Sequence, residues 1–288
     1  MTDPIELLGH SNYVNDILFD SDGKTLISAG MDNVIVIWET ESWKKEATLK
    51  GHSNSVNNLA LDSRNERLVS SSTDKTLKVW KMSTYAIAHT LTGHTNTVGV
   101  VEISPDDKYV ISSSYDETIK LWSLETGEKI LSQKLGRVKA RFSSQEAVIV
   151  GGAGGKLSIY SIPEFTEILN FEAHKSYVMD FLFSSDGQYL VSSGYDHKLR
   201  IWSVEGWKEE KITDIGLKGG LYSLAISPDD DKIALTCDYQ LNVYSLKTGE
   251  LLTEYKVKPK GNYSVKFSPD GQWLALGSAD KKIRLWQL

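Results

Sequence analysis

A histidine, a serine, an aspartate and a tryptophan recur four times along the chain at one fixed spacing. The four sets are His10/Ser28/Asp32/Trp38, His52/Ser70/Asp74/Trp80, His94/Ser112/Asp116/Trp122 and His174/Ser192/Asp196/Trp202. Serine, histidine and aspartate are the groups of a hydrolase triad, in which the histidine takes a proton from the serine hydroxyl. Because a catalytic nucleophile is not copied into repeat after repeat, we expect these sets to brace the fold rather than to perform catalysis.

The sets belong to a longer repeat, in which two alternating apolar residues are followed by an aromatic residue. The aromatic residues are Trp38, Trp80, Trp122, Tyr160, Trp202, Tyr244 and Trp286, separated by steps of 42, 42, 38, 42, 42 and 42 residues. Alternation with a period of two is typical of β-strands. In the third repeat it predicts strands over 98–103, 109–114, 119–123 and 129–133. Four antiparallel strands in each of seven repeats predict an all-β fold, the seven-bladed β-propeller.

The two ends of the chain predict how the ring closes. The last repeat ends in a strand over 282–288 with no fourth strand after it, whereas residues 5–8 lie where the other repeats have their fourth strand. We therefore expect the N-terminal strand to complete the last blade, which protects strand edges that would otherwise pair with other chains. The seven repeats occupy residues 1–288, so the sequence predicts a single domain.

The amino-acid composition argues against several kinds of partner and site. Lys and Arg total 32 against 38 Asp and Glu, a net charge of −6, which disfavours a nucleic-acid partner. The single cysteine, Cys237, excludes an intramolecular disulfide and a multi-cysteine zinc site. The chain has no apolar run of about 18 residues and no basic-then-apolar leader. We expect no membrane partner and a cytoplasmic location, with the nucleus as the alternative compartment.

Gly-His, then Ser-x-x-x-Asp, then five residues and Trp, resembles the pattern of the WD-repeat family over essentially the whole chain. The resemblance implies a hydrogen-bonded chain from the indole N–H through serine and histidine to aspartate, each bond contributing about 1 kcal/mol. The sequence departs from the family pattern at three points. No Trp is followed by Asp, repeats four and six end in Tyr160 and Tyr244, and Gly-His is absent from repeats four, six and seven.

The resemblance also implies a function, that of a non-enzymatic scaffold for other proteins. WD-repeat proteins often bind peptides on the face that carries the connections between blades and the turns between each blade's second and third strands, here called the top face. At the corresponding positions nine residues are predicted to contact a partner: Tyr13, Tyr115, Arg137, Lys139, Tyr177, Met179, Tyr195, Tyr222 and Tyr263. Tyr, Met and Arg are favoured in interface cores. Arg137 and Lys139 would steer an acidic or phosphorylated segment.

Other interpretations stay open. The nine residues could pack the rim of the ring instead of binding a partner, and Trp43 and Trp207 could either form a second contact surface or cover blade edges. The chain could be an adaptor or substrate-recognition subunit of a larger enzyme complex. A small-molecule or metal site in the central channel is a further alternative, with Asp16 and Asp180 as its acidic groups. We expect no enzyme activity, cofactor or metal, and a monomeric propeller that joins hetero-complexes.

The glycine-rich stretch 151–156 is tested as a phosphate-binding loop. It lacks the first glycine and the Ser/Thr of that motif, since Val150 and Leu157 stand there, and no helix is predicted after it. The stretch is therefore interpreted as a tight turn between two strands.

Overall fold

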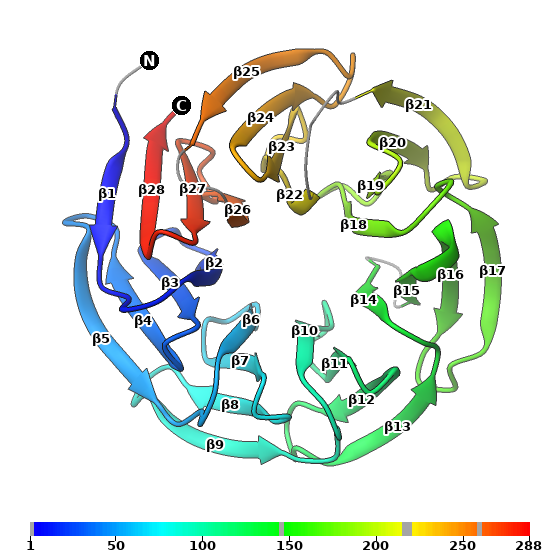
Figure 1. The fold of residues 1–288 in the computed structure, drawn as a ribbon. Coiled ribbons are helices and arrows are strands. Elements are labelled where there is room, and N and C mark those ends of the chain that lie inside the picture. The colour runs from blue at the N-terminus through cyan, green and yellow to red at the C-terminus, as the bar shows by residue number, and fades with distance from the viewer. Residues whose placement is uncertain (1–2, 144–146, 215–220, 258–260) are drawn as a thin grey trace.

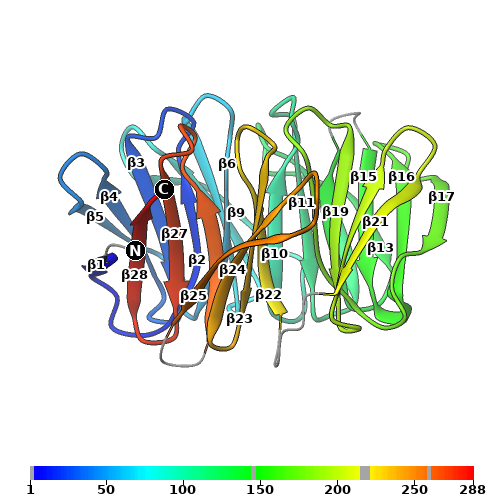
Figure 2. The same cartoon turned by 90° about the horizontal axis from the view of Figure 1, so that it is seen from above.

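The computed structural model describes residues 3–143, 147–214, 221–257 and 261–288. These residues form seven four-stranded antiparallel sheets, which stand as blades around a central axis (Figure 1). Seen from the side, the blades lie next to one another in a short disk (Figure 2). The predicted seven-bladed propeller is confirmed. Within the described ranges, no helix has the length and apolar character that crossing a membrane would need.

The first three blades are each built from four consecutive strands, ordered from the axis outward. Blade 1 consists of β2 (Val14–Phe19), β3 (Thr25–Gly30), β4 (Val34–Glu39) and β5 (Lys44–Lys50). Blade 2 consists of β6 (Val56–Leu61), β7 (Arg67–Ser72), β8 (Leu77–Lys81) and β9 (Ala86–Leu91). Blade 3 consists of β10 (Val98–Ile103), β11 (Tyr109–Ser114), β12 (Thr118–Ser123) and β13 (Lys129–Lys134).

Blades 4 to 6 follow the same order, and blade 7 takes its outer strand from the start of the chain. Blade 4 consists of β14 (Val138–Phe142), β15 (Ala147–Gly152), β16 (Lys156–Ser161) and β17 (Glu167–Glu172). Blade 5 consists of β18 (Val178–Phe183), β19 (Tyr189–Gly194), β20 (Lys198–Ser203) and β21 (Lys208–Asp214). Blade 6 consists of β22 (Leu221–Ile226), β23 (Lys232–Cys237), β24 (Gln240–Ser245) and β25 (Leu251–Lys256). Blade 7 consists of β26 (Asn262–Phe267), β27 (Trp273–Ser278), β28 (Lys282–Gln287) and β1 (Ile5–Leu8).

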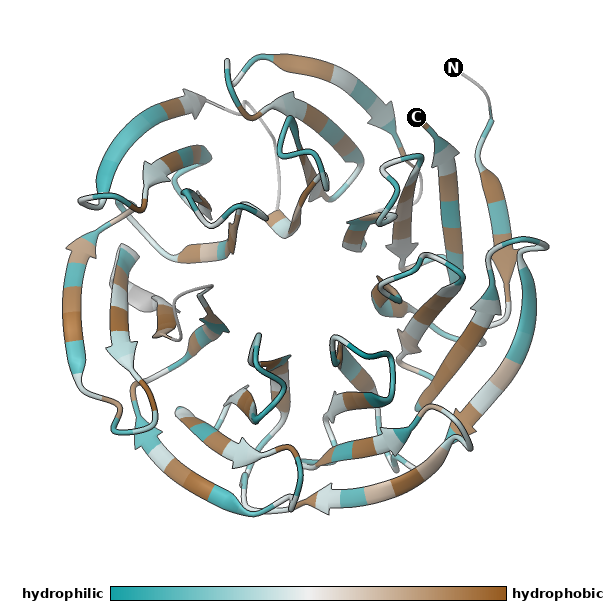
Figure 3. Cartoon of the chain, turned by 180° about the vertical axis from the view of Figure 1, so that it is seen from behind, coloured by the Kyte–Doolittle hydropathy of each residue, from teal (hydrophilic) through white to brown (hydrophobic). Residues whose placement is uncertain are grey.

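The position of a strand within its blade determines its composition. The second strands, such as β3, are buried along nearly their whole length because neighbouring blades cover both faces. The outer strands, such as β17, are mostly exposed, and β17 has a glutamate at each end. Figure 3 shows this distribution, with apolar bands along the strands and hydrophilic loops on the rims of the ring.

Apolar clusters hold the blades together, and among the described residues one lies between each pair of neighbours. In each, the aromatic residue that ends a repeat packs against the preceding blade. Trp80 lies in one cluster with Ile27 of blade 1, and Trp122 lies in another with Val69 of blade 2. Full burial of a large apolar side chain stabilises a fold by about 1.5–3 kcal/mol, so these contacts are a main source of cohesion.

The innermost strands have an edge that faces the channel, and the N–H groups on that edge need acceptors. Side chains of the preceding blade supply them: Asp16 accepts from Leu59 N at 2.9 Å, and Asn58 accepts from Val101 N at 2.9 Å. The same arrangement joins Glu102 to Phe142 N (2.6 Å), Asp180 to Leu224 N (3.1 Å), Ser223 to Val265 N (3.4 Å) and Ser264 to Ile17 N (3.3 Å). Between blades 4 and 5 the acceptor lies on the following blade instead, since Arg141 donates to Asp180 at 3.0 Å.

The ring closes as predicted, because β1 pairs antiparallel with β28 and places Ile5 opposite Leu285. Figure 1 shows β1 beside β28 at this blade. Leu7 is buried in the cluster between blades 7 and 1, whereas Leu8 is 72% exposed. Glu6 forms ion pairs with Lys282 at 2.6 Å and with Arg284 at 3.2 Å.

We expect Leu7→Ala to lower the free energy of unfolding by about 2–5 kcal/mol, because it leaves a cavity in the closing cluster. The matched control is Leu8→Ala, which removes the neighbouring exposed leucine and should change stability by less than about 0.5 kcal/mol. Urea denaturation followed by tryptophan fluorescence measures both. Equal effects of the two substitutions would show that β1 does not close the ring.

Candidate functional site

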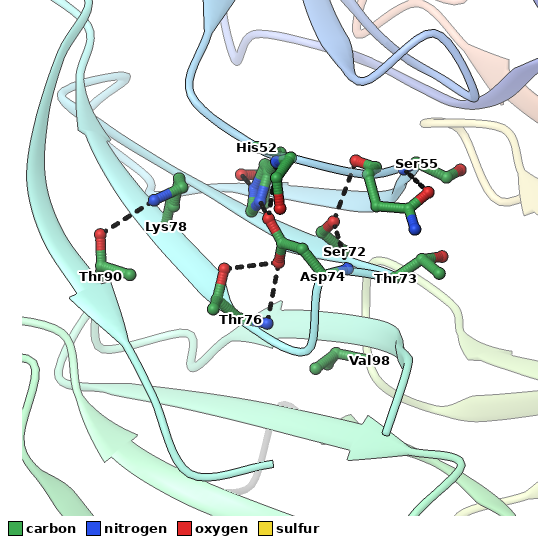
Figure 4. A network of polar contacts seen from close by, with 12 residues as sticks. His52, Ser55, Ser72, Thr73, Asp74, Thr76, Lys78, Thr90 and Val98 are labelled. Carbon is green, nitrogen blue, oxygen red and sulfur yellow. Dashed lines mark hydrogen bonds and ion pairs between the residues drawn. The ribbon is translucent and has the colours of Figure 1, made fainter. Parts of the chain in front are cut away.

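The four predicted sets are each brought together inside one blade. In blade 2, Trp80 Nε1 donates to Ser70 Oγ at 2.8 Å, and His52 Nε2 lies 2.8 Å from the same oxygen. His52 Nδ1 lies 2.7 Å from the Asp74 carboxylate (Figure 4). The corresponding histidine–aspartate distances in blades 1, 3 and 5 are 3.0, 2.8 and 2.8 Å. In blades 1 to 3, donors and acceptors match when the histidine is neutral with its proton on Nδ1, because the serine then donates to Nε2.

The aspartate of each set also fixes the loops of the top face. Asp74 accepts hydrogen bonds from Ser53 N at 3.1 Å and from the Thr76 hydroxyl at 2.6 Å, so it ties the loop entering blade 2 to the turn after β7 (Figure 4). Although burial opposes ionisation, hydrogen bonds from His52 and Thr76 hold the pKa of Asp74 well below its usual range. The carboxylate therefore stays charged and keeps these loops together.

The burial of these sets favours bracing over catalysis. Ser28, Ser70 and Ser192 are fully buried and Ser112 is 1% exposed, so a substrate has no access to their hydroxyls. Burial also lowers the pKa of His94 and of His174, which keeps both rings neutral. A neutral histidine inside the blade suits a structural hydrogen-bonded chain.

The glycine-rich stretch of blade 4 forms the tight turn expected of it. Ala153–Gly155 make a short 3-10 turn between β15 and β16. Gly155 has a φ of 74°, and a Cβ there would lie 1.9 Å from the carbonyl oxygen of His174. The glycine thus permits a close approach of two backbones.

A β-bulge in the innermost strand re-aims one side chain in six of the seven blades. In blade 1 the register shifts between Val14 and Asp16, and the same shift occurs in blades 2, 3, 5, 6 and 7. Bulges bend a strand and redirect the extra residue. The bulged residues are Asn15, Asn57, Gly99, Met179, Tyr222 and Tyr263. Blade 4 has no shift, since Val138 pairs with Gly152 and Lys139 pairs with Gly151.

Lys139 lies at a different position from the one predicted. Because blade 4 lacks the bulged residue, Lys139 takes the place in the register that Asp180 has in blade 5. Its Nζ lies 3.3 Å from Asp180 Oδ1, and Arg141 contacts the same oxygen at 3.0 Å. Burial alone would raise the pKa of Asp180, but these two cations hold that pKa well below its usual range. The charge of Lys139 is thus balanced inside the ring.

A hollow of about 350 Å³ opens on the top face across blades 3, 4 and 5. Its origin lies in the bulge positions. In blades 1 and 2, Asn15 and Asn57 reach the next blade, and their Nδ2 atoms donate to the carbonyls of Val56 and Val98 at 2.8 Å each. Blade 3 has Gly99 at this position and supplies no such bridge. Five of the nine predicted contact residues line the hollow: Tyr115, Arg137, Lys139, Tyr177 and Met179.

Arg137 is held at the wall of the hollow by Tyr115. Its guanidinium carbon lies 5.3 Å from the centroid of the Tyr115 ring, a cation–π contact. Among the described residues, no hydrogen bond or ion pair of this guanidinium is present. Tyr115 and Tyr177 are 56% and 52% exposed. The hollow therefore presents a cation against the Tyr115 ring, and the solvent-accessible Tyr177 ring lines the same hollow.

A second group of predicted residues forms an aromatic cluster across blades 6, 7 and 1. The Tyr222 and Tyr263 rings meet edge to face with centroids 5.3 Å apart, and Tyr13 lies 6.0 Å from Tyr263. Tyr222 donates its hydroxyl hydrogen to Asp238 at 2.5 Å. Burial and this bond raise the pKa of Tyr222. The ninth residue, Tyr195, adjoins the hollow, since its backbone N–H donates to the Tyr177 carbonyl at 2.8 Å.

Trp43 and Trp207 pack between blades, in agreement with the edge-covering alternative. Their ring centroids lie 5.1 Å from Trp273 and 6.0 Å from Phe171 of the preceding blades. Both have a positive φ, 54° and 52°, which is uncommon for residues other than glycine. Packing against the neighbouring blade offsets that backbone cost.

The acidic residues of the channel are engaged within the ring. Asp16 accepts from Ser264 Oγ at 2.7 Å as well as from Leu59 N, and Asp180 binds the two cations of blade 4. In the described part of the chain, no group of three or more His, Cys, Asp or Glu side chains could hold a metal ion. Both carboxylates are engaged by contacts within the ring.

Comparison with known proteins agrees with this architecture. The model of the WD domain, G-beta repeat, matches residues 3–39, 43–81, 86–123, 165–203 and 254–287, more than half of the chain. The chain belongs to the WD-repeat family.

Individual relatives match parts of the chain. WD repeat-containing protein 26 homolog of Arabidopsis thaliana is 31% identical over 46% of this chain and 24% of its own length. Serine-threonine kinase receptor-associated protein of Gallus gallus is 29% identical over 52% and 42%. Small ribosomal subunit protein RACK1 of Candida albicans is 28% identical over 44% and 42%. The matched region spans less than half of each relative.

We expect Ser70→Ala to lower the free energy of unfolding by about 1–3 kcal/mol, because Trp80 and His52 both lose a buried hydrogen-bond partner. The neighbouring Ser71 is the matched control. Within the described ranges its buried hydroxyl has no hydrogen-bond partner, so Ser71→Ala should change stability by less than about 0.5 kcal/mol. Chemical denaturation compares the two variants, and a cost of Ser71→Ala equal to that of Ser70→Ala would contradict the bracing role.

Stability should fall as the solution is acidified. In the unfolded chain histidine titrates near pH 6.5, whereas the pKa of His94 and His174 is lower in the folded protein. Below about pH 6.5 the unfolded chain therefore binds protons that the folded chain does not, and the free energy of unfolding decreases. Protonation of Asp74, Asp116 and Asp196 adds a second decrease below about pH 4, because their pKa values are lowered by folding.

Urea denaturation at about pH 7.5, 5.5 and 4 measures this dependence. The variant His94→Gln should lose less stability than the wild type between the first two values. An identical loss in both proteins would show that His94 does not contribute.

Proposed function

We propose that this protein is a non-enzymatic scaffold of the cytoplasm that binds an anionic segment of a partner protein in the top-face hollow. The position of Arg137 is the observation that carries the proposal. Its guanidinium lies against the Tyr115 ring and, within the described residues, is not neutralised by a carboxylate. A planar guanidinium that is already oriented can bind a carboxylate or a phosphate through two parallel hydrogen bonds.

The walls of the hollow suit the remainder of a bound segment. Tyr115, Tyr177 and Met179 supply apolar surface beside the cation. Tyrosine offers a large contact area with few rotatable bonds, so its ordering on binding costs little entropy. Arginine beside tyrosine is a composition typical of binding hot spots.

The names of the relatives support a role in assemblies of proteins. They include a small ribosomal subunit protein, a receptor-associated protein and a subunit of the THO complex. By analogy with these relatives, the partner could itself be part of a larger complex, in which this chain would act as an adaptor.

Peptide arrays test the proposal directly. Three sets of otherwise random peptides would carry glutamate, phosphoserine or glutamine at one central position. The wild-type protein should retain the two anionic sets about tenfold more strongly than the glutamine set, because a hydrogen bond to a charged group contributes about 1.5–3 kcal/mol. The glutamate and phosphoserine arms distinguish a carboxylate from a phosphate.

Arg137→Gln should abolish the preference for anionic peptides. Arg64→Gln is the matched control, because Arg64 is exposed in the cleft beside the turn after β6, at the opposite end of the blades. It removes the same charge and should leave the preference intact. Equal retention of all three peptide sets by the wild type would refute the proposal.

A further inference from the structure

A cavity of about 440 Å³ opens between blades 5 and 6, at the end of the blades opposite the top face. The turns after β18, β22 and β24 contribute its walls, together with the outer strand β21, and the two blades are neighbours in the ring (Figure 1). We propose that this cavity binds an arginine side chain of a partner protein. The inference concerns a second surface of the ring and does not depend on the hollow at Arg137.

The floor of the cavity is apolar. Ile201 and Leu246 are buried in the cluster between blades 5 and 6, and the partly buried ring of Tyr189 packs against the same cluster. An arginine side chain has an aliphatic stem that packs on such a surface while its charged head stays at the rim. Its planar guanidinium also stacks on aromatic rings, so the Tyr189 ring suits it.

Four carboxylates surround this floor, and they belong to Asp186, Glu210, Asp229 and Asp230. In the described part of the chain, none of the four forms an ion pair with a Lys, Arg or His side chain. Both lysines of the wall have other partners. Lys247 Nζ pairs with Asp231 at 2.8 Å, and Lys211 Nζ donates to the Lys247 carbonyl at 3.1 Å. The cavity therefore has an excess of negative charge, which is complementary to a cation.

Asp186 and Asp229 are held in place with one oxygen each left open. In both, Oδ1 accepts from the serine hydroxyl two residues earlier, at 2.6 and 2.5 Å. The same oxygen accepts from the backbone N–H two residues later, at 2.9 and 3.2 Å. These bonds, above all those from the serines, lower the pKa of both carboxyl groups, so both stay charged. Among the described residues neither Oδ2 has a hydrogen-bond donor, which leaves it available to a ligand.

The chain itself places an arginine in the corresponding cavity between blades 2 and 3. Arg67 has the strand position in blade 2 that Tyr189 has in blade 5, since each pairs with the residue after its blade's tryptophan. The Arg67 guanidinium donates to the carbonyl of Leu124 at 3.4 Å and binds the Glu125 carboxylate. Leu124 lines that cavity as Leu246 lines the one between blades 5 and 6. This kind of blade junction thus accommodates a guanidinium, and no described arginine lines the junction of blades 5 and 6.

The acidic groups are arranged differently at the two junctions. Lys247 stands where blade 3 has Glu125, so the carboxylate that holds Arg67 has no counterpart on that turn. Asp186 and Asp229 supply carboxylates from two different blades instead. A guanidinium has five N–H donors in a planar fork to share between them, whereas the ammonium group of lysine is a compact point charge. The cavity therefore suits arginine better than lysine.

Retention of short peptides on the immobilised protein tests the inference. Three peptide sets of random sequence would carry arginine, lysine or citrulline at one central position, and citrulline is the uncharged analogue of arginine. At about 0.15 M salt, which screens long-range attraction, the wild type should retain the arginine set about tenfold more strongly than the citrulline set. It should retain the lysine set less strongly than the arginine set.

The double variant Asp186→Asn/Asp229→Asn should lose this preference, because it removes the two open charges and keeps an oxygen for each serine. The matched control is Asp106→Asn/Asp270→Asn. These two carboxylates accept the same serine and backbone bonds in blades 3 and 7 and do not line the cavity. The control removes the same charge and should keep the preference for arginine.

Tyr189→Arg is a second, independent variant. It places an arginine of the chain at the position that Arg67 has between blades 2 and 3, so it should fill the cavity and weaken retention of the arginine set. Urea denaturation checks that each variant is folded.

The outcomes separate this inference from the proposed function. Equal retention of arginine and citrulline peptides by the wild type would overturn the inference, as would an equal loss of preference in the control double variant. Equal retention of lysine and arginine peptides would overturn the assignment to a guanidinium. Arg137 does not line this cavity, so Arg137→Gln should retain arginine peptides as the wild type does, and failure of either proposal leaves the other standing.

Discussion

The indole N–H group of the four repeats with a complete set imposes the constraint on which the regular blades depend. Trp80 buries its ring against the preceding blade, yet it carries one N–H group that must find an acceptor in the interior. Ser70 accepts that hydrogen, His52 accepts from the serine, and Asp74 completes the chain at the rim. The polar chain thus couples packing between blades to the conformation of the loops on the top face. A Cβ on Gly51 would lie 2.8 Å from the indole, which explains the glycine before the histidine.

The candidate binding site lies where blades 3 and 4 depart from the pattern that the other blades repeat. Blade 4 lacks the bulge and the serine–aspartate pair, and the cations of its innermost strand bind Asp180 instead. Blade 3 has Gly99 where blades 1 and 2 have bridging asparagines. These departures leave the hollow open without breaking the ring, because the apolar cluster between blades 3 and 4 remains. The regular blades supply rigidity, and the irregular ones supply the opening.

The recurrent aromatic residues and the period-two alternation between them predicted the blades and their number. Closure by residues 5–8 was predicted from the missing fourth strand of the last repeat. The register position of Lys139 and its ion pair with Asp180 could not be predicted from the sequence. A step of 38 residues shows that blade 4 is shorter, but whether a bulge residue is among those missing depends on backbone pairing. The side chains that accept hydrogen bonds from the innermost strand of the next blade were also not predicted. Asp16, Asn58 and Ser264 are different residue types and share only their position in the strand.

Hydrogen exchange of the indole N–H groups, followed by NMR, tests the indole–serine hydrogen bonds in the folded protein. If the polar chains brace the blades, the indole protons of Trp38, Trp80, Trp122 and Trp202 will exchange only when the whole ring unfolds. The partly exposed Trp43, which lies outside these chains, provides the fast reference. Exchange of the four indole protons as rapid as that of Trp43 would mean that the buried polar chains are not closed in solution, and this account of the propeller would be contradicted.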